Sequence, residues 1–265
     1  MLDKKQKYLQ IALNNTLEEA RSIIEQIPLD KRIIIEAGTP LIKTYGVYGI
    51  RKIKTWWEER IFGFGGSILE ETQKTPSLIY SLISSLAKIP SFEEKVSSLR
   101  ETREGVFTPY IVADLKCMDR GKTEAEIAKK GGASAAVALG QAPIETLNAF
   151  IEECETLGLD SMIDMMNVDY CLEVLGKLKK LPTVVILHRG VDEEAFNPES
   201  EIPYHEIHRI KENYDVLVAV AGGDTIQEVQ RAIFNDADIV VVWKSFYKST
   251  AETAKLAAEF LKEIR

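Results

Sequence analysis

Apolar and amphipathic segments alternate along most of this chain. Short apolar runs rich in isoleucine, valine, leucine and alanine are each followed by a longer amphipathic stretch. This alternation is typical of repeated β-α units that build a parallel sheet. Strands are predicted at Tyr8–Leu13, Arg32–Ala37, Tyr110–Asp114, Ala135–Leu139, Ser161–Asp164, Thr183–His188, Val216–Val220 and Ile239–Val242. A chain with this series of units is predicted to form an α/β protein of the (β/α)8 barrel class, also called a TIM barrel.

Recognisable helix starts support several of these units. Thr16, Pro143, Thr225 and Thr250 follow the first, fourth, seventh and eighth strands. A side-chain oxygen or a proline at such a position suits the first turn of a helix. The last helix is predicted at Ala251–Ile264, where it would close the ring.

One segment interrupts the rhythm. About fifty residues separate the helix near Tyr48–Trp57 from the third strand, far more than a usual connection. We therefore expect a helical insertion at 58–106, which contains a glycine-rich turn at Phe62–Ser67, a helix at Ser77–Ala87 and a charged stretch at Phe92–Glu104. Because no strand precedes the glycine-rich turn, a hinge leading to a helix that packs on the barrel or on a second subunit is favoured over a phosphate-binding loop.

Length and charge narrow the class of protein. The 265 residues suit one barrel domain over 1–265. A net charge of -8 argues against a nucleic-acid surface, and no apolar stretch approaches the roughly 18 residues of a membrane span. Cys117, Cys154 and Cys171 lack metal-ligand spacing and a disulfide framework, so we expect small apolar residues in a reducing compartment. A cytoplasmic protein without nucleic-acid or membrane partners is expected.

Polar residues gather where the predicted strands end. The active site of a (β/α)8 barrel lies at the carboxyl ends of its strands. Asp114 and Lys116 are two positions apart and project together, whereas Asp119 falls in the following loop. Burying such charges costs several kcal/mol unless they pair, bind a metal or meet a substrate, and a simple ion pair at a strand end is the plainer alternative. Other candidates at strand ends are Asn14, Glu36, Asp164, His188, Arg189, Gly222 and Gly223.

The residue types at these ends indicate their chemistry. Glu36 and Asp114 offer hard oxygen ligands of the kind that Mg²⁺ prefers. His188 can transfer protons near neutral pH. The other two histidines fall on a helix predicted at Tyr204–Asn213 and are expected to be exposed to solvent.

The seventh and eighth strand ends are candidates for an anion site. Gly222 and Gly223 open a helix, so their backbone N–H groups could hold a phosphate. Lys244 and Ser245 follow the eighth strand and could supply a charge and a hydroxyl to the same anion. The alternative is a lysine whose side chain extends past a packed Trp243 toward solvent.

A family resemblance rests on six segments in a fixed order. They are Leu9–Leu13, Glu36–Pro40, Ala113–Asp119, Ile163–Val168, His188–Asp192 and Val218–Gly223. Together they resemble 3-hexulose-6-phosphate synthase and its relatives in the orotidine 5′-monophosphate decarboxylase superfamily. The Asp-x-Lys-x-x-Asp element alone is typical of the whole superfamily. Glu36 within Glu-Ala-Gly-Thr-Pro resembles the branch that contains the synthase and keto-gulonate phosphate decarboxylase.

The resemblance implies a Mg²⁺-dependent carbon–carbon lyase that stabilises an enediolate of a sugar phosphate. Glu36 and Asp114 would match the metal ligands, Lys116 the residue beside the reacting oxygens, and His188 the proton-transfer residue. In the synthase, the enediolate of ribulose 5-phosphate attacks formaldehyde, and the reverse cleavage also occurs. The resemblance further implies a homodimer with shared active sites, in which Asp119 reaches into the neighbour's site.

Two departures from the family leave the substrate open. The first strand usually ends in an aspartate where this chain has Asn14, which keeps hydrogen bonding and removes a charge. A glycine pair that binds phosphate usually follows the eighth strand, where this chain has Trp243, Lys244 and Ser245. One alternative is a decarboxylase or other lyase with a different phosphorylated substrate, which Arg189 also favours. Another is an inactive barrel that serves as a binding or regulatory protein.

Overall fold

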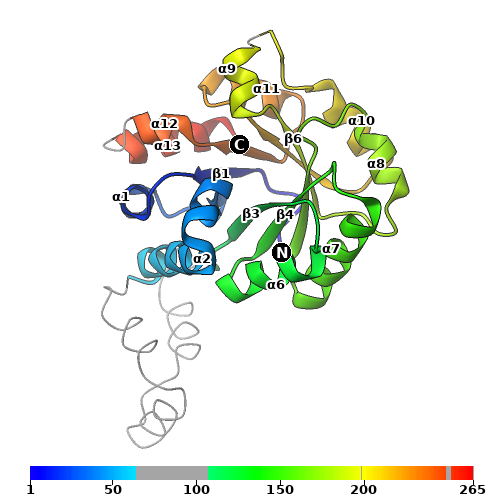
Figure 1. The fold of residues 1–265 in the computed structure, drawn as a ribbon. Helices are drawn as coiled ribbons and strands as arrows, with labels where there is room; N and C mark the ends of the chain where they lie inside the picture. The colour runs from blue at the N-terminus through cyan, green and yellow to red at the C-terminus, as the bar shows by residue number, and fades with distance from the viewer. Residues whose placement is uncertain (64–106, 198, 249–251, 265) are drawn as a thin grey trace, which may run out of the picture.

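A closed barrel of parallel strands forms the centre of the protein. The computed structural model describes residues 1–63, 107–197, 199–248 and 252–264 (Figure 1). The strands pair in sequence order, and β1 pairs with β8 to close the barrel. They are β1 Tyr8–Leu13, β2 Ile33–Ala37, β3 Ile111–Cys117, β4 Ala135–Leu139, β5 Asp160–Asp164, β6 Val184–His188, β7 Leu217–Ala221 and β8 Ile239–Val242. The predicted (β/α)8 barrel is confirmed.

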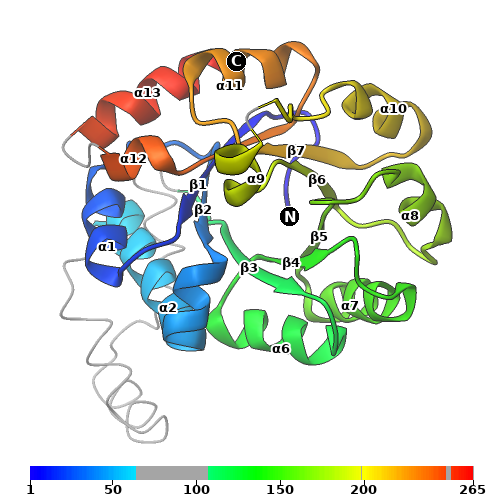
Figure 2. The same cartoon turned by 45° about the horizontal axis from the view of Figure 1, so that its top comes forward.

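Helices surround the strands as an outer ring (Figure 2). They are α1 Leu17–Gln26, α2 Thr39–Phe62, α6 Gly121–Gly131, α7 Ile144–Leu157, α8 Cys171–Lys177, α9 Val191–Phe196, α10 His205–Asn213, α11 Ile226–Phe234, α12 Lys244–Lys248 and α13 Thr253–Glu263. Of the described helices, none is long and apolar enough to cross a membrane.

The helix starts agree with the sequence at three positions. Thr16 and Thr225 each accept a hydrogen bond from the backbone of the third helical residue and form capping boxes, and Pro143 precedes α7. The expected start at Thr250 lies outside the described residues. The last helix is α13 Thr253–Glu263, which lies within the predicted Ala251–Ile264. The short helix α12 before it was not predicted.

Much of the predicted insertion lies outside the described residues. Its helix at Ser77–Ala87, its charged stretch at Phe92–Glu104 and most of its glycine-rich turn fall in the undescribed range 64–106. At its beginning, α2 continues to Phe62 and ends at Gly63 in the left-handed conformation, with φ of 70°. The first positions of the predicted insertion are therefore the last turn of α2.

Side chains point alternately to the two faces of each strand and so form two separate hydrophobic cores. On β1, Leu9, Ile11 and Leu13 pack between the strands and the helices, whereas Tyr8 and Ala12 belong to a cluster inside the barrel. Full burial of each such aliphatic side chain contributes roughly 1.5–3 kcal/mol. Interior positions near the carboxyl ends are taken by polar side chains instead, and these line the cavity described below.

The third strand departs from its expected end. The sequence predicted a stop at Asp114, but β3 continues to Cys117 through a register shift against β4. Within the shift, Lys116 has a φ of 49°, a value that few non-glycine residues adopt. The pairing resumes between Cys117 and Ala138. The irregular backbone is thus located at one of the predicted catalytic residues.

Candidate active site

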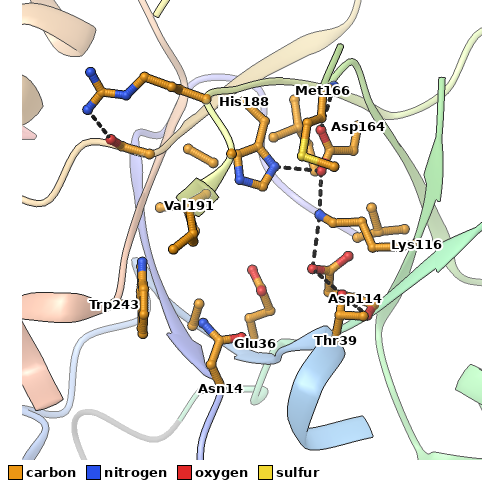
Figure 3. A pocket seen from close by; sticks show the side chains of 18 of the residues that line it. Asn14, Glu36, Thr39, Asp114, Lys116, Asp164, Met166, His188, Val191 and Trp243 are labelled. Carbon is orange, nitrogen blue, oxygen red and sulfur yellow. Dashed lines mark hydrogen bonds and ion pairs between the residues drawn. The ribbon is translucent and has the colours of Figure 1, made fainter. Parts of the chain in front are cut away.

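A cavity of about 390 Å³ opens at the carboxyl ends of the strands. Every strand of the barrel except β4, β7 and β8 contributes a charged or polar side chain to it. The side chains converge from opposite sides, and Trp243 lines the cavity just after β8 (Figure 3). The sequence-predicted residues that line this cavity are Asn14, Glu36, Asp114, Lys116, Asp164, His188, Arg189 and Gly222.

Lys116 is held between two carboxylates. Its Nζ lies 3.1 Å from Asp114 Oδ2 and also donates to Asp164 Oδ2 (Figure 3). Burial lowers the pKa of Lys116, but the carboxylates of Asp114 and Asp164 outweigh it and raise the pKa above its usual value. The side chain therefore presents a fixed ammonium group to the cavity.

Asp164 joins Lys116 to His188. Its Oδ2 also lies 2.8 Å from His188 Nδ1, and its side chain is fully buried. Burial raises the pKa of Asp164, but His188 and Lys116 outweigh it and lower the pKa to about 2. The ionised Asp164 is suited to accept a hydrogen bond from Nδ1–H of His188. This contact fixes the orientation of the imidazole beside the cavity.

Glu36 and Asp114 form a carboxylate pair whose nearest cation, Lys116, is shared with Asp164. Burial and the nearby Asp114 carboxylate raise the pKa of Glu36 to about 7. Gln10 donates a hydrogen bond to Glu36, and the Thr39 hydroxyl lies 2.9 Å from Asp114 Oδ2. Asp114 Oδ1 is buried and has no hydrogen-bond partner among the described residues. An unpaired buried carboxylate oxygen is costly, so this pair is suited to accept a further cation.

Asn14 occupies its place because the neighbouring residue is a glycine. A Cβ atom at Gly38 would lie 1.9 Å from Asn14 Oδ1, so a larger residue there would displace the Asn14 side chain. The Asn14 backbone N–H donates to the Tyr247 hydroxyl at 2.9 Å. Burial raises the pKa of Tyr247 to about 12, so its phenol stays neutral at physiological pH. The strand-end asparagine is built into the wall of the cavity.

Arg189 is tied to the rim on the side of β7. Its guanidinium donates to the carbonyl oxygens of Gly222 at 3.0 Å and Ser200 at 3.2 Å, and contacts Glu228 at 3.4 Å. The Arg189 guanidinium therefore lies beside the cavity, and most of its N–H groups point to oxygen atoms of the protein.

The end of β8 is also bonded internally. Asp224 Oδ1 accepts the backbone N–H groups of Trp243 at 2.6 Å and Lys244 at 3.0 Å. Lys244 Nζ lies 2.5 Å from Glu194 Oε2 and 5.7 Å from the centre of the Trp243 ring. Ser245 donates its hydroxyl to the Asp224 carbonyl at 2.6 Å. Trp243 lines the cavity, whereas the side chains of Lys244 and Ser245 face residues of their own chain.

Asp119 and Gly223 do not line the cavity of this chain. Asp119 is exposed in the loop after β3, and its Oδ1 accepts the backbone N–H of Arg120 at 2.7 Å. The remaining histidines, His205 and His208, are exposed on α10 as expected. Cys117, Cys154 and Cys171 are free thiols and are buried, in agreement with their interpretation as apolar residues.

Several residues of the site were missed by the sequence prediction. Gln10 is the one polar residue within the apolar first strand, which was an available signal for an interior role. Thr39 follows the strand that carries Glu36. Glu194 and Asp224 gave no comparable signal, because carboxylates outside the strands are common and the partners of these two are distant in sequence.

Similar solved structures define the class of this barrel. 3-Hexulose-6-phosphate synthase from Salmonella typhimurium superposes with a TM-score of 0.70 at 22% identity, over 97% of this chain and 98% of that one. KGPDC from Streptococcus mutans gives 0.66 at 17% identity, over 98% and 97%. These structures share the (β/α)8 fold.

Sequence relatives narrow the class to a family. The bifunctional enzyme Fae/Hps of Methanocella arvoryzae is 35% identical over 242 residues, which are 90% of this chain and 48% of the relative. The Methanocaldococcus jannaschii enzyme of the same name is 33% identical over 243 residues, with 91% and 48% covered. The chain thus spans about half the length of the curated relatives it matches. The profile of the Orotidine 5'-phosphate decarboxylase / HUMPS family matches residues 84–258, and the chain belongs to this family.

Proposed function

We propose that this barrel is a Mg²⁺-dependent carbon–carbon lyase of the 3-hexulose-6-phosphate synthase type. It would join ribulose 5-phosphate to formaldehyde, or catalyse the reverse cleavage. The observation that carries the proposal is Lys116, fixed between Asp114 and Asp164 at the cavity beside Glu36. The relatives named Fae/Hps and the similar synthase structure support the same class of reaction. Because the chain spans half of those relatives, the proposal extends only to this barrel.

Glu36 and Asp114 are the residues that would hold Mg²⁺. The unpaired Asp114 Oδ1 and the raised pKa of Glu36 both favour an added cation. Within the described ranges, no three His, Cys, Asp or Glu side chains converge as metal ligands. Two carboxylates suit Mg²⁺, which keeps several waters and takes oxygens from its substrate. When bound, the ion would stabilise negative charge that develops on substrate oxygens.

His188 would transfer the proton, and Lys116 would stabilise the negative charge that develops. Nε2 of His188 would take the C1 proton of ribulose 5-phosphate, and the enediolate oxygens would meet the Lys116 ammonium. A preorganised charge at that position lowers the barrier without reorganisation during the reaction. The C1 carbon would then attack formaldehyde, and the proton held by His188 would pass to the new hydroxyl. Asp164 would keep the imidazole oriented and stabilise its charged form.

A direct assay tests this function. The pure chain is incubated with ribulose 5-phosphate, formaldehyde and Mg²⁺, and formation of the hexulose phosphate is followed with an EDTA control. We expect turnover that EDTA abolishes. If there is neither condensation nor reverse cleavage at high enzyme concentration, the lyase assignment is wrong. Binding of sugar phosphates without turnover would instead favour the inactive barrel.

We also propose a homodimer in which Asp119 serves the partner's site. Its exposure and its position outside the cavity of its own chain support this role. Lys116→Ala and Asp119→Ala variants can be mixed after separate purification. A mixed dimer has one site with both residues intact, so random exchange would restore roughly a quarter of wild-type activity. Failure to restore activity, with exchange shown by mass spectrometry, would contradict a shared site.

A further inference from the structure

One carboxylate contacts both cations on the far rim of the cavity. Glu194 on α9 places Oε2 at 2.5 Å from Lys244 Nζ and at 4.0 Å from the Arg189 guanidinium. Glu194 itself lines the cavity, and only about a quarter of the Lys244 side chain is exposed. The position between these two cations is where an anionic group of a bound ligand would gain most.

The backbone donors nearby are held by other carboxylates. Asp224 Oδ1 binds the N–H groups of Trp243 and Lys244, and Glu228 Oε2 binds the N–H of Asp224 at 3.0 Å. Asp224 is fixed by two bonds to the turn after β8 and by its place in the turn after β7. An incoming anion therefore cannot use these amides unless the barrel turns themselves rearrange.

Glu194 differs from Asp224 in how firmly it is held. It belongs to α9, a helix of six residues in which no described side chain is buried. Val191 and Phe196 of this helix are 49% and 86% exposed. Few buried contacts make a segment inexpensive to displace. Of the carboxylates at the rim, Glu194 is thus the one that a ligand can replace.

We propose that Glu194 is a specificity-determining residue that occupies the anion position between Lys244 and Arg189 until a phosphate group displaces it. A phosphate carries up to two charges and several acceptor oxygens, so it can outcompete one carboxylate for both cations. An uncharged sugar cannot, and it leaves Glu194 in place. The residue thereby sets a minimum charge for the substrate. This inference rests on the proposed phosphorylated substrate and adds the residue that selects for it.

The inference is tested by titrating inorganic phosphate into the full chain by calorimetry. Glu194→Gln removes the competing charge, so phosphate should bind roughly three- to tenfold more tightly. Asp192→Asn removes a charge from an exposed residue of the same helix and should leave the affinity unchanged. In a Lys244→Met background, the effect of Glu194→Gln should shrink to less than roughly twofold, because the shared cation is gone.

Several results would overturn the inference. The first is unchanged or weaker phosphate binding in Glu194→Gln. The second is an equal gain of phosphate affinity in Asp192→Asn. The third is a gain from Glu194→Gln that persists in the Lys244→Met background. Absence of phosphate binding in every folded variant, with folding checked by circular dichroism, would overturn it as well. The titration needs neither formaldehyde nor turnover, so it can succeed even when the lyase assay fails.

Discussion

The two sides of the cavity differ in how their charges are balanced. On one side, Glu36 and Asp114 stand together, and one carboxylate oxygen lacks any donor among the described residues. On the other side, Glu194 contacts both Lys244 and Arg189, and Glu228 also contacts Arg189. The first side holds more carboxylates than cations and is suited to an added cation. On the second side, two cations and two carboxylates balance, so an anion would have to displace a carboxylate. A single cavity thus combines a proposed cation site, which the cation would complete, with a proposed anion site, where the anion would displace the Glu194 carboxylate.

Lys116 joins Asp114 to Asp164 on the first side, and its loss should have the largest effect. Lys116→Ala removes the ammonium from the reacting oxygens, so turnover should fall by about 10³-fold or more. It also leaves Asp114 and Asp164 without their shared cation, which should lower the free energy of unfolding by roughly 3 kcal/mol. Assay and urea unfolding measure these effects. Lys177→Ala, at an exposed ion pair with Glu173, is the control and should change neither. Activity within tenfold of wild type in Lys116→Ala would refute the role.

Exchanging one carboxylate on each side should have different consequences for Mg²⁺ binding. Glu36→Gln removes a proposed ligand, so Mg²⁺ affinity should fall at least roughly tenfold. Glu194→Gln, on the opposite rim, should leave Mg²⁺ affinity unchanged. Calorimetric titration of Mg²⁺ into both variants tests the contrast. Equal losses of Mg²⁺ affinity in the two variants would show that the ion responds only to the general negative charge of the cavity and not to Glu36 in particular.

Asp164 should make the free energy of unfolding of the protein depend on pH. Its pKa in the folded protein is about 2, below the ordinary value of 3.8, so it stabilises the fold above pH 4. This contribution, roughly 2 kcal/mol at pH 7, is lost as the pH falls through the folded pKa. The difference in unfolding free energy between wild type and Asp164→Asn should therefore narrow by roughly 1 kcal/mol from pH 7 to pH 3. A difference that stays constant with pH would contradict the paired, ionised Asp164.

Thr39 should have the smallest effect of the four. Thr39→Val keeps the shape of the side chain and removes the hydroxyl contact with Asp114, which costs about 1 kcal/mol of stability. Thr44→Val is the control, because its hydroxyl contacts only the exposed Pro40 carbonyl of its own helix. We expect a lower unfolding free energy and weaker Mg²⁺ binding in Thr39→Val alone. The same loss in both variants would mean that the hydroxyl does not position Asp114.

The strands were predictable because each is an apolar run flanked by amphipathic helices. The third strand shows where this reasoning fails. Charged residues at Asp114 and Lys116 suggested a strand end, but the register shift lets β3 carry both side chains into the cavity and continue to Cys117. Local patterns do not encode such an irregularity, because it depends on the pairing with β4.

The two sides of the cavity also differed in how far the sequence predicted them. Glu36, Asp114 and Lys116 were found because charges are unexpected in buried strands. The contact between Glu194 and Lys244 joins residues 50 positions apart, on the two short helices α9 and α12. Their pairing depends on the tertiary arrangement of α9 and the end of β8. The sequence therefore predicted the residues on the strands and named Lys244 and Arg189 as candidates, but the contact of Glu194 with both cations required the structure.

The most direct test of the central claim is hydrogen exchange at C1 of ribulose 5-phosphate. The chain is incubated with this sugar phosphate in D₂O without formaldehyde, and the C1 proton signal is followed by NMR. If Lys116, His188 and the carboxylate pair stabilise an enediolate, wild type should exchange one C1 proton only when Mg²⁺ is present. Lys116→Ala should show no exchange. Ribulose 5-phosphate that binds to the wild-type chain with Mg²⁺ and retains both C1 protons would contradict the account.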